Sequence, residues 1–177
     1  IQRVVDLLLQ LASLEARKAR PDFKAVDLAQ VAREVVDAAQ PAAQVGRVSL
    51  TLDTSAPTAC RGDAALLAQA VSNLVQNALA FTPAGGTVVV RTSSSLDGGA
   101  RITVDDTGTG IPDYAQARIF ERFYSLPRPG TGVKSTGLGL SLVREIANLH
   151  DGEISVTNRA EGGVRAEMRI PIHRAPV

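Results

Sequence analysis

The sequence has no tryptophan and, among 177 residues, only four phenylalanines and two tyrosines. A core with so few aromatic residues must be built mainly from Leu, Val, Ile and Ala. The sequence also has a single cysteine, Cys60, so an intrachain disulfide is excluded and a reducing compartment is the expected environment. We expect Cys60 to be a small apolar residue of the interior.

The chain also lacks an excess of charge of one sign and a long hydrophobic run. Its formal net charge is +1, which gives no electrostatic reason to expect nucleic acid as a partner. No run of about 18 apolar residues and no signal peptide is visible, so we expect these residues to be soluble and cytoplasmic. The sequence begins within a helical pattern and without an initiator methionine, and we therefore expect it to be part of a longer protein.

Local patterns predict helices and strands in mixed order. The spacing of apolar residues predicts helices over 1–18, 27–46, 63–78, 114–121 and 138–150. Alternation and turn residues predict strands over 48–52, 87–94, 101–105, 153–159 and 164–170. Asp27 and Gln30 form a D-x-x-Q pattern, which indicates a capping box at the second helix. Intermixed elements of this kind favour a sheet that is covered by helices on one face.

The first predicted helix carries an apolar face at heptad spacing. Ile1, Val4, Leu8 and Leu11 define this face, and Pro21 ends the helix. A helix this apolar is costly to leave in water, so we expect it to pair with another helix. A frayed terminus is the alternative.

The first of three polar motifs is an asparagine pair. Asn73 and Asn77 are four residues apart in VSNLVQNALAFT, so they share one face of a helix. A carboxamide oxygen suits a Mg²⁺ ion that is already bound by phosphate oxygens and water. The alternative is a solvated helix face.

The second motif, DDTGTGIP, follows a predicted strand. Asp106 can accept a hydrogen bond from an exocyclic amine such as that of adenine. Gly108 and Gly110 let the backbone approach a flat ring, because they have no Cβ. The alternative is an ordinary turn rich in Asp and Gly at the end of a strand.

The third motif, STGLGLS at residues 135–141, runs directly into a helical pattern. A glycine inside a helix costs roughly 1 kcal/mol relative to alanine, and the motif is neither a Walker loop nor a dinucleotide fingerprint. Gly137 and Gly139 leave backbone N–H groups free at the start of the helix, where phosphate is stabilised. The alternative is an unusual but purely structural helix entry.

The order of these motifs, with F-E-R-F-Y between the second and the third, resembles the N, G1, F and G2 boxes of sensor histidine kinases. The resemblance covers nearly the whole chain and implies a Bergerat-type α/β sandwich (α+β), with a mixed, mostly antiparallel sheet and helices on one face. Residues 1–20 would end the dimerisation and phosphoacceptor hairpin, and residues 21–177 would form the catalytic ATP-binding domain. Residues 118–147, with EGGV later, are similar to CreC-type kinases in particular.

The resemblance implies a role for each motif. Asn77 would be the Mg²⁺ ligand and Asp106 would bind the amine of adenine. Asn73 and Arg122 would be the catalytic residues, with Asn73 towards the phosphates and Arg122 near the γ-phosphate or the partner domain. The other nucleotide-binding residues, beside Asn73 and Asn77, would be Phe81, Gly108, Gly110, Ile111, Lys134, Thr136, Gly137, Leu138, Gly139 and Leu140. The loop over residues 125–134 would be part of a lid that is mobile without nucleotide. Phe120 and Phe123 would couple this lid to the sheet, with ordinary core aromatics as the alternative.

Two residue choices bear on the mechanism. Hydrolysing relatives have a glutamate general base at the position of Asn73, whereas an amide takes no proton at neutral pH. The site would therefore not activate water, and the nucleophile that attacks ATP would be a histidine imidazole. Family members often have Lys or Arg at the position of Ala80. The lid cations Arg128 and Lys134 are the expected substitutes.

A histidine kinase also needs a phosphoacceptor histidine, and this sequence has only His150 and His173. His150 ends a predicted helix, where it would favour the helix dipole, so we expect a structural role. His173 lies in the tail and is expected to be solvated. The acceptor would therefore lie on a segment outside this sequence.

The resemblance thus implies transfer of the γ-phosphoryl group of MgATP to a histidine on the dimerisation domain of the same protein. A response regulator, CreB-type if the finer resemblance holds, would then take the phosphoryl group. The full-length protein would be a homodimer anchored in the inner membrane, with this domain in the cytoplasm. The alternatives are a non-transferring nucleotide-sensing scaffold and an anti-sigma-type serine kinase, whose relatives lack the F-E-R-F-Y box.

Overall fold

The structure is a computed structural model, and it describes residue 12 and residues 23–54, 56–94, 99–132 and 134–171. A five-stranded sheet forms one layer, with the strand order β2-β4-β5-β7-β6. The strands are β2 (Ser49–Thr54), β4 (Thr87–Ser94), β5 (Ala100–Asp106), β6 (Glu153–Asn158) and β7 (Val164–Ile170). β2 and β4 are parallel and the other pairs are antiparallel, which confirms the expected mixed, mostly antiparallel sheet.

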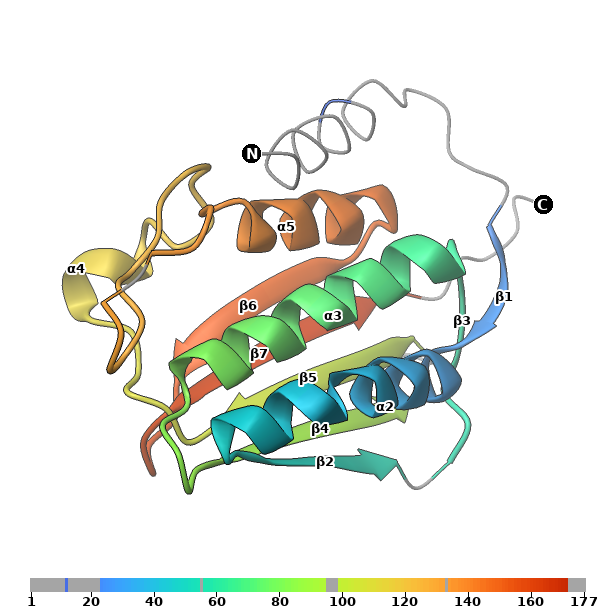
Figure 1. The fold of residues 1–177 in the computed structure, drawn as a ribbon. Helices are drawn as coiled ribbons and strands as arrows, with labels where there is room; N and C mark the ends of the chain where they lie inside the picture. Colours follow the sequence, from blue (N-terminus) through green and yellow to red (C-terminus); the bar gives the residue numbers. More distant parts are fainter. Residues whose placement is uncertain (1–11, 13–22, 55, 95–98, 133, 172–177) are drawn as a thin grey trace.

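Three helices form the second layer and cover one face of the sheet (Figure 1). They are α2 (Leu28–Gly46), α3 (Ala64–Phe81) and α5 (Gly139–Leu149), and the short helix α4 (Asp113–Gln116) lies beside them. The core between the layers is aliphatic, as the composition predicts. Phe23 is the one aromatic residue among the buried hydrophobic residues of the described chain.

The central helix α3 has an apolar composition, and by length and hydropathy alone it could cross a membrane. Its apolar side, however, packs into the domain core, as the sequence predicts. Leu67, Val71, Leu74 and Val75 are buried there. α3 is therefore the core helix of a layered domain.

Two short strands, β1 (Lys24–Asp27) and β3 (Ala59–Gly62), were absent from the predicted elements. They pair with each other as a separate antiparallel ribbon, with Lys24 opposite Gly62. Neither has a clear apolar alternation, and the partner of each lies more than 30 residues away in sequence, so local patterns do not indicate them.

Two other local predictions need correction. Asp27 caps α2 through a hydrogen bond from the backbone N–H of Ala29, but the reciprocal half of the capping box is missing. The amide of Gln30 donates to Glu34 instead. The helix predicted over 114–121 is only one turn long, because the chain continues through turns after Gln116. The boundary at residue 20 and, apart from residue 12, the predicted helix over 1–18 lie outside the described residues.

Candidate functional site

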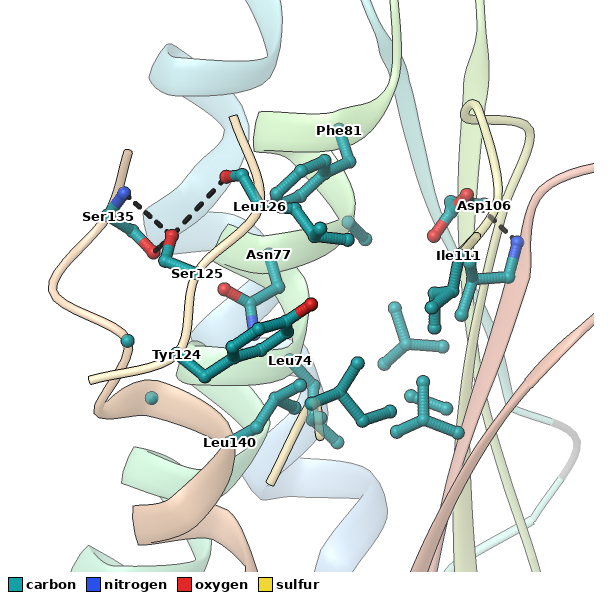
Figure 2. Close-up of a pocket in the computed structure, with 18 of the residues that line it drawn as sticks. Leu74, Asn77, Phe81, Asp106, Ile111, Tyr124, Ser125, Leu126, Ser135 and Leu140 are labelled. Carbon is teal, nitrogen blue, oxygen red and sulfur yellow. Dashed lines mark hydrogen bonds between the residues drawn. The ribbon is translucent and has the colours of Figure 1, made fainter. Parts of the chain in front are cut away.

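A cavity of about 120 Å³ lies between α3, the sheet and the segment that leads into α5. Figure 2 shows side chains of α3 and of this segment on one side, and Asp106 and Ile111 facing them from the other. Most of the lining side chains are apolar, among them Leu74, Ile119 and Val156. The predicted site residues that line the cavity are Asn77, Phe81, Asp106, Gly110, Ile111, Gly137, Gly139 and Leu140.

Asp106 ends strand β5 and is only 5% exposed. Its Oδ1 accepts hydrogen bonds from the backbone N–H groups of Gly108, at 2.8 Å, and Val164, at 3.1 Å. Its Oδ2 has no hydrogen bond to any described residue, and Figure 2 shows one carboxylate oxygen turned towards the cavity. Burial raises the pKa of Asp106, against the opposing effects of these two N–H groups and of Arg159. A buried acceptor that faces a cavity calls for a donor from a ligand.

The glycines that follow Asp106 are required by close contacts. A Cβ at Gly108 would lie 2.5 Å from the backbone oxygen of Phe81, which no side chain can tolerate. Gly110 has φ +77°, a conformation that side chains rarely adopt. The loop can therefore pass directly beneath Phe81 and turn into the cavity wall at Ile111.

The two asparagines of α3 lie next to the first turn of α5. Asn77 lines the cavity, and its carboxamide forms no hydrogen bond with any described residue. Asn73 lies one turn earlier, and its Nδ2 donates to the backbone oxygen of Gln69 at 3.1 Å, which leaves Oδ1 available. A Cβ at Gly139 would lie 3.4 Å from Asn73 Oδ1 and 3.9 Å from Asn77 Nδ2. The alternative of a wholly solvated helix face therefore does not describe this pair.

The start of α5 carries free backbone donors. Leu138 is the N-cap residue but offers no side-chain hydrogen bond to the helix. Gly137 has φ +69°, and a Cβ there would meet the backbone of Phe123 at 2.5 Å. Gly137 is therefore required by the backbone conformation and by its close approach to Phe123, whereas Gly139 faces the asparagine pair.

The two ends of the loop over residues 125–134, the predicted lid, are joined by hydrogen bonds of Ser125 with Ser135. The hydroxyls of Ser125 and Ser135 are 2.9 Å apart, and the Ser135 backbone N–H donates to Ser125 Oγ at 3.0 Å. Further along, Pro127 and Lys134 form an isolated β-bridge. Figure 2 shows this serine pair at the edge of the cavity.

Several predicted residues do not line the cavity: Asn73, Gly108, Arg122, Lys134, Thr136 and Leu138. Arg122, Arg128 and Lys134 are exposed, and Leu138 is buried in the core. Phe123 is 62% exposed, so it is not an ordinary core aromatic. No Lys or Arg is among the described residues that line the cavity.

The donor set fits a metal that arrives with its nucleotide better than a permanently bound one. The described residues contain no group of three or more His, Cys, Asp or Glu side chains that could hold a metal ion. The Asn77 carboxamide offers one neutral oxygen, which suits Mg²⁺ whose other ligands are phosphate oxygens and water. These residues therefore fit a Mg²⁺–nucleotide complex.

His150 has the expected structural role but for a different reason. Its ring is fully buried and stacks on Phe23, with 4.5 Å between ring centroids. Nε2 accepts from the backbone N–H of Asp63 at 3.0 Å, and Nδ1 lies 2.7 Å from the Ile146 carbonyl, which can only accept. The imidazole is therefore neutral, and the expected favourable charge at the helix end is wrong.

Cys60 is half-buried in β3 and agrees with its predicted structural role. Burial, together with the nearby charge of Asp27, raises the pKa of its thiol to about 11. A thiol with so high a pKa is almost entirely protonated at neutral pH and is a poor nucleophile.

Sequence reasoning missed several residues that shape the site. Tyr124, Ser125 and Ser135 line the cavity although no motif argument selected them. Asn158 and Arg159 bind the backbone of the loop that carries Asp106. The positions of Tyr124 in F-E-R-F-Y, of Ser125 in the predicted lid and of Ser135 in STGLGLS could have signalled a role, whereas the contacts of Asn158 and Arg159 join segments that are far apart in sequence.

Comparisons with known proteins agree with this geometry. Residues 62–174 match the family of histidine kinase-, DNA gyrase B- and HSP90-like ATPases. The chain is 43% identical over 175 residues to Sensor protein CreC of Escherichia coli (strain K12), covering 98% of this chain and 36% of CreC. It is 36% identical over 172 residues to Sensor histidine kinase TmoS of Ectopseudomonas mendocina, covering 96% of this chain and 18% of TmoS. The chain therefore spans about a third or less of these relatives.

Solved structures show the same fold. The catalytic domain of histidine kinase ThkA, nucleotide-free, has a TM-score of 0.74 at 27% identity, covering 85% of this chain and 96% of that one. Full-length ShkA in complex with AMPPNP has a TM-score of 0.83 at 28% identity, covering 99% of this chain and 36% of that one. The chain belongs to the histidine kinase-, DNA gyrase B- and HSP90-like ATPase family, and within it to the catalytic ATP-binding domains of sensor histidine kinases.

Proposed function

We propose that this domain binds MgATP in the described cavity and donates its γ-phosphoryl group to a histidine on a separate segment. The observation that carries the proposal is the meeting of three features at one cavity. These are the Asp106 oxygen that has no partner among the described residues, Asn77 of α3 with Asn73 one turn away beside Gly139, and the first turn of α5, which has no side-chain cap. The AMPPNP complex of the related ShkA also supports it.

The adenine ring lies in the apolar part of the cavity. Phe81 and Ile111 provide apolar surface for the ring, and Asp106 Oδ2 accepts a hydrogen bond from its exocyclic amine. A hydrogen bond to an ionised group contributes about 1.5–3 kcal/mol, so this contact distinguishes adenine from a 6-oxo purine.

The phosphates lie between Gly139 and the asparagines. The free N–H groups and the dipole at the start of α5 stabilise negative charge there. Asn77, with Asn73 beside it, would hold Mg²⁺, and the bound ion would supply positive charge against the charge that develops during phosphoryl transfer. Arg128 and Lys134 are the cations that approach the phosphates when the lid closes, in place of the Lys or Arg that family members often have at the position of Ala80. Arg122 approaches the γ-phosphate.

The site favours phosphoryl transfer to a histidine over hydrolysis, because it holds the nucleotide and has no general base for water among the described residues. An imidazole nitrogen of the acceptor attacks the γ-phosphorus, the bond to the β–γ bridging oxygen breaks with its electrons remaining on ADP, and the imidazole loses a proton. Asn73 cannot take a proton from water. Asp106 is the one carboxylate among the described lining residues, and it accepts the hydrogen bond from adenine, so it does not act as a base towards water. Hydrolysis therefore stays slow.

In the full-length protein, the acceptor histidine belongs to the dimerisation domain of a membrane-anchored homodimer. The ATP-binding domain described here lies in the cytoplasm. The phosphoryl group then passes to the aspartate of a response regulator. Similarity to CreC favours a CreB-type regulator.

The experiment uses γ-labelled ATP with this chain alone and with an added dimerisation domain. We expect acid-labile label on the added domain only. Acid-labile label on this chain alone would contradict the absence of an acceptor. MgATP binding without transfer to the acceptor domain from the same protein would instead indicate a non-transferring scaffold.

A further inference from the structure

The loop over residues 106–111, called here the adenine loop, is held mainly from outside itself. Within it, the Gly108 N–H donates to Asp106 Oδ1, and at its start the Thr107 N–H donates to Thr87. Thr107 Oγ1 also accepts from the Thr87 N–H at 2.9 Å, whereas both hydrogen bonds of the Ile111 backbone and the further ones to the Asp106 carbonyl and carboxylate come from the end of β6 and the turn into β7. The orientation of Asp106 and Ile111 towards the cavity therefore depends on this second segment.

Arg159 holds the first residue of the adenine loop. Its guanidinium donates to the backbone oxygen of Asp106 at 2.7 Å, and it lies 3.6 Å from the carboxylate of Glu161. The side chain is only 20% exposed, and its Nε is buried without a hydrogen-bond partner among the described residues. Burying a charged guanidinium costs desolvation free energy, and the hydrogen bond to the Asp106 carbonyl offsets part of this cost. The charge also opposes the effect of burial on the pKa of Asp106 and favours its ionised form.

Asn158 holds the last residue of the adenine loop. Its Oδ1 accepts from the Ile111 N–H at 2.7 Å, and its Nδ2 donates to the Ile111 carbonyl at 2.8 Å. A Cβ at Gly110 would lie 3.2 Å from Asn158 Oδ1, so the glycine lets the carboxamide reach the backbone. These two hydrogen bonds hold the peptide groups on both sides of Ile111 and so orient its backbone.

The turn that follows leaves little room for the loop to shift. A Cβ at Gly163 would lie 2.0 Å from the Asp106 carbonyl oxygen, the atom that also accepts from Arg159. The next residue, Val164, donates its N–H to Asp106 Oδ1. Asp106 is thus held through its carbonyl and its side chain by residues more than 50 positions later in the chain.

We propose that Asn158 and Arg159 are positioning residues that orient the adenine loop, and that they thereby determine selectivity for a 6-amino purine. The proposal rests on the proposed function, since it assumes that adenine occupies the cavity. A purely structural role would lower stability in the same way for any ligand. A positioning role changes the ratio of affinities for two purines that differ at the 6-position.

The test measures calorimetric affinities for MgADP and MgIDP, because inosine replaces the 6-amine by an oxo group. The parent protein should prefer MgADP by at least about tenfold, since a site built for a donor rejects an analogue that lacks it. Arg159→Met and Asn158→Ala should each lower that ratio by about fivefold or more. Arg159→Lys should restore part of it.

Arg33→Met and Thr157→Ala are the matched controls. Arg33 is exposed on α2 and bonds to Gln30, and Thr157 is exposed beside Asn158, so both should keep the parent ratio. Thermal unfolding of every variant separates loss of stability from loss of selectivity. If Arg159→Met does not fold, the ratios for Asn158→Ala and Arg159→Lys decide.

The outcomes separate the two proposals. A parent protein that does not prefer MgADP would overturn the adenine site itself and, with it, the positioning role. A parent that prefers MgADP, with variants that keep the parent ratio while losing stability, would overturn only the positioning role. Lowered ratios in the two positioning variants, with unchanged controls, would support both.

Discussion

The backbone of Gly139 lies against the carboxamide of Asn73, so that a Cβ at residue 139 would be 3.4 Å from Asn73 Oδ1. This distance is an ordinary van der Waals contact, and the backbone of Gly139 is not in the left-handed region. The protein could therefore hold an alanine at this position. A glycine here is explained by the space it leaves beside the asparagines.

Gly139→Ala should accordingly separate stability from binding. In a helix interior alanine is favoured over glycine by roughly 0.5–1 kcal/mol, and at the first residue of α5 the gain is smaller, so the free energy of unfolding should stay the same or rise slightly. The added methyl group would occupy the space proposed for the phosphates, so MgADP affinity should fall about tenfold or more. Calorimetry and urea unfolding of the same preparation provide both values.

Gly137→Ala is the contrasting variant. At φ +69°, with a Cβ only 2.5 Å from the backbone of Phe123, alanine should destabilise the domain by about 1 kcal/mol or more. If Gly139→Ala instead lost stability and kept its affinity, the glycine turn would be a purely structural helix entry.

Asn77→Ala tests the proposed metal ligand. The parent should bind ADP more tightly with Mg²⁺ than with EDTA, and the variant should bind equally in both. Asn77 forms no hydrogen bond with the described residues, so its removal should change the melting temperature little. Gln76→Ala, on the exposed side of the same turn, is the control. A variant that keeps the full effect of Mg²⁺ would rule out this ligand.

The raised pKa of Asp106 predicts a pH dependence. Burial makes this carboxyl take up a proton at a higher pH than the ordinary value of 3.8. Protonation removes the charged acceptor, so MgADP affinity should fall as the pH is lowered through this raised value. Asp106→Asn should bind weakly throughout and lose that dependence. Calorimetry over a pH series provides the comparison, with Asp113→Asn, an exposed site, as control.

The same shift has an opposite consequence for folding. Because the pKa is higher in the folded state than in the unfolded chain, the contribution of Asp106 to stability is present at low pH and is lost as the pH rises through the folded value. Without nucleotide at neutral pH, Asp106→Asn should therefore be at least as stable as the parent. A clear loss of stability in Asp106→Asn would contradict this.

The lid role predicts protection from proteolysis. Lys134 is exposed and ends the loop, whereas Arg128 precedes Pro129, a bond that trypsin cuts poorly. Closure over bound MgADP should slow cleavage after Lys134 by about tenfold or more at saturation, since a ligand suppresses local opening in proportion to its excess over Kd. The fragment that results from cleavage after Lys134 is the one that is absent from the digest of Lys134→Gln. Equal cleavage rates with and without nucleotide would exclude lid closure.

Much of the architecture was visible in local patterns. The apolar side of α3, its Asp63 cap and the strands of the sheet follow from spacing and turn residues that lie close together in sequence. The motif order indicated the family, and the cavity then brought most of the predicted residues together. These features were predictable because each depends on neighbours within one element or one turn.

What the sequence alone determined is therefore the set of elements, the aliphatic core and the types of residue available to bind a nucleotide. Tertiary structure decided which backbone atoms those residues meet. Arg159 reaches Asp106 across 53 positions, Asn158 reaches Ile111 across 47, and His150 accepts from Asp63 across 87. No periodicity records such contacts, because they arise only when the packed sheet and helices bring distant segments within hydrogen-bonding distance.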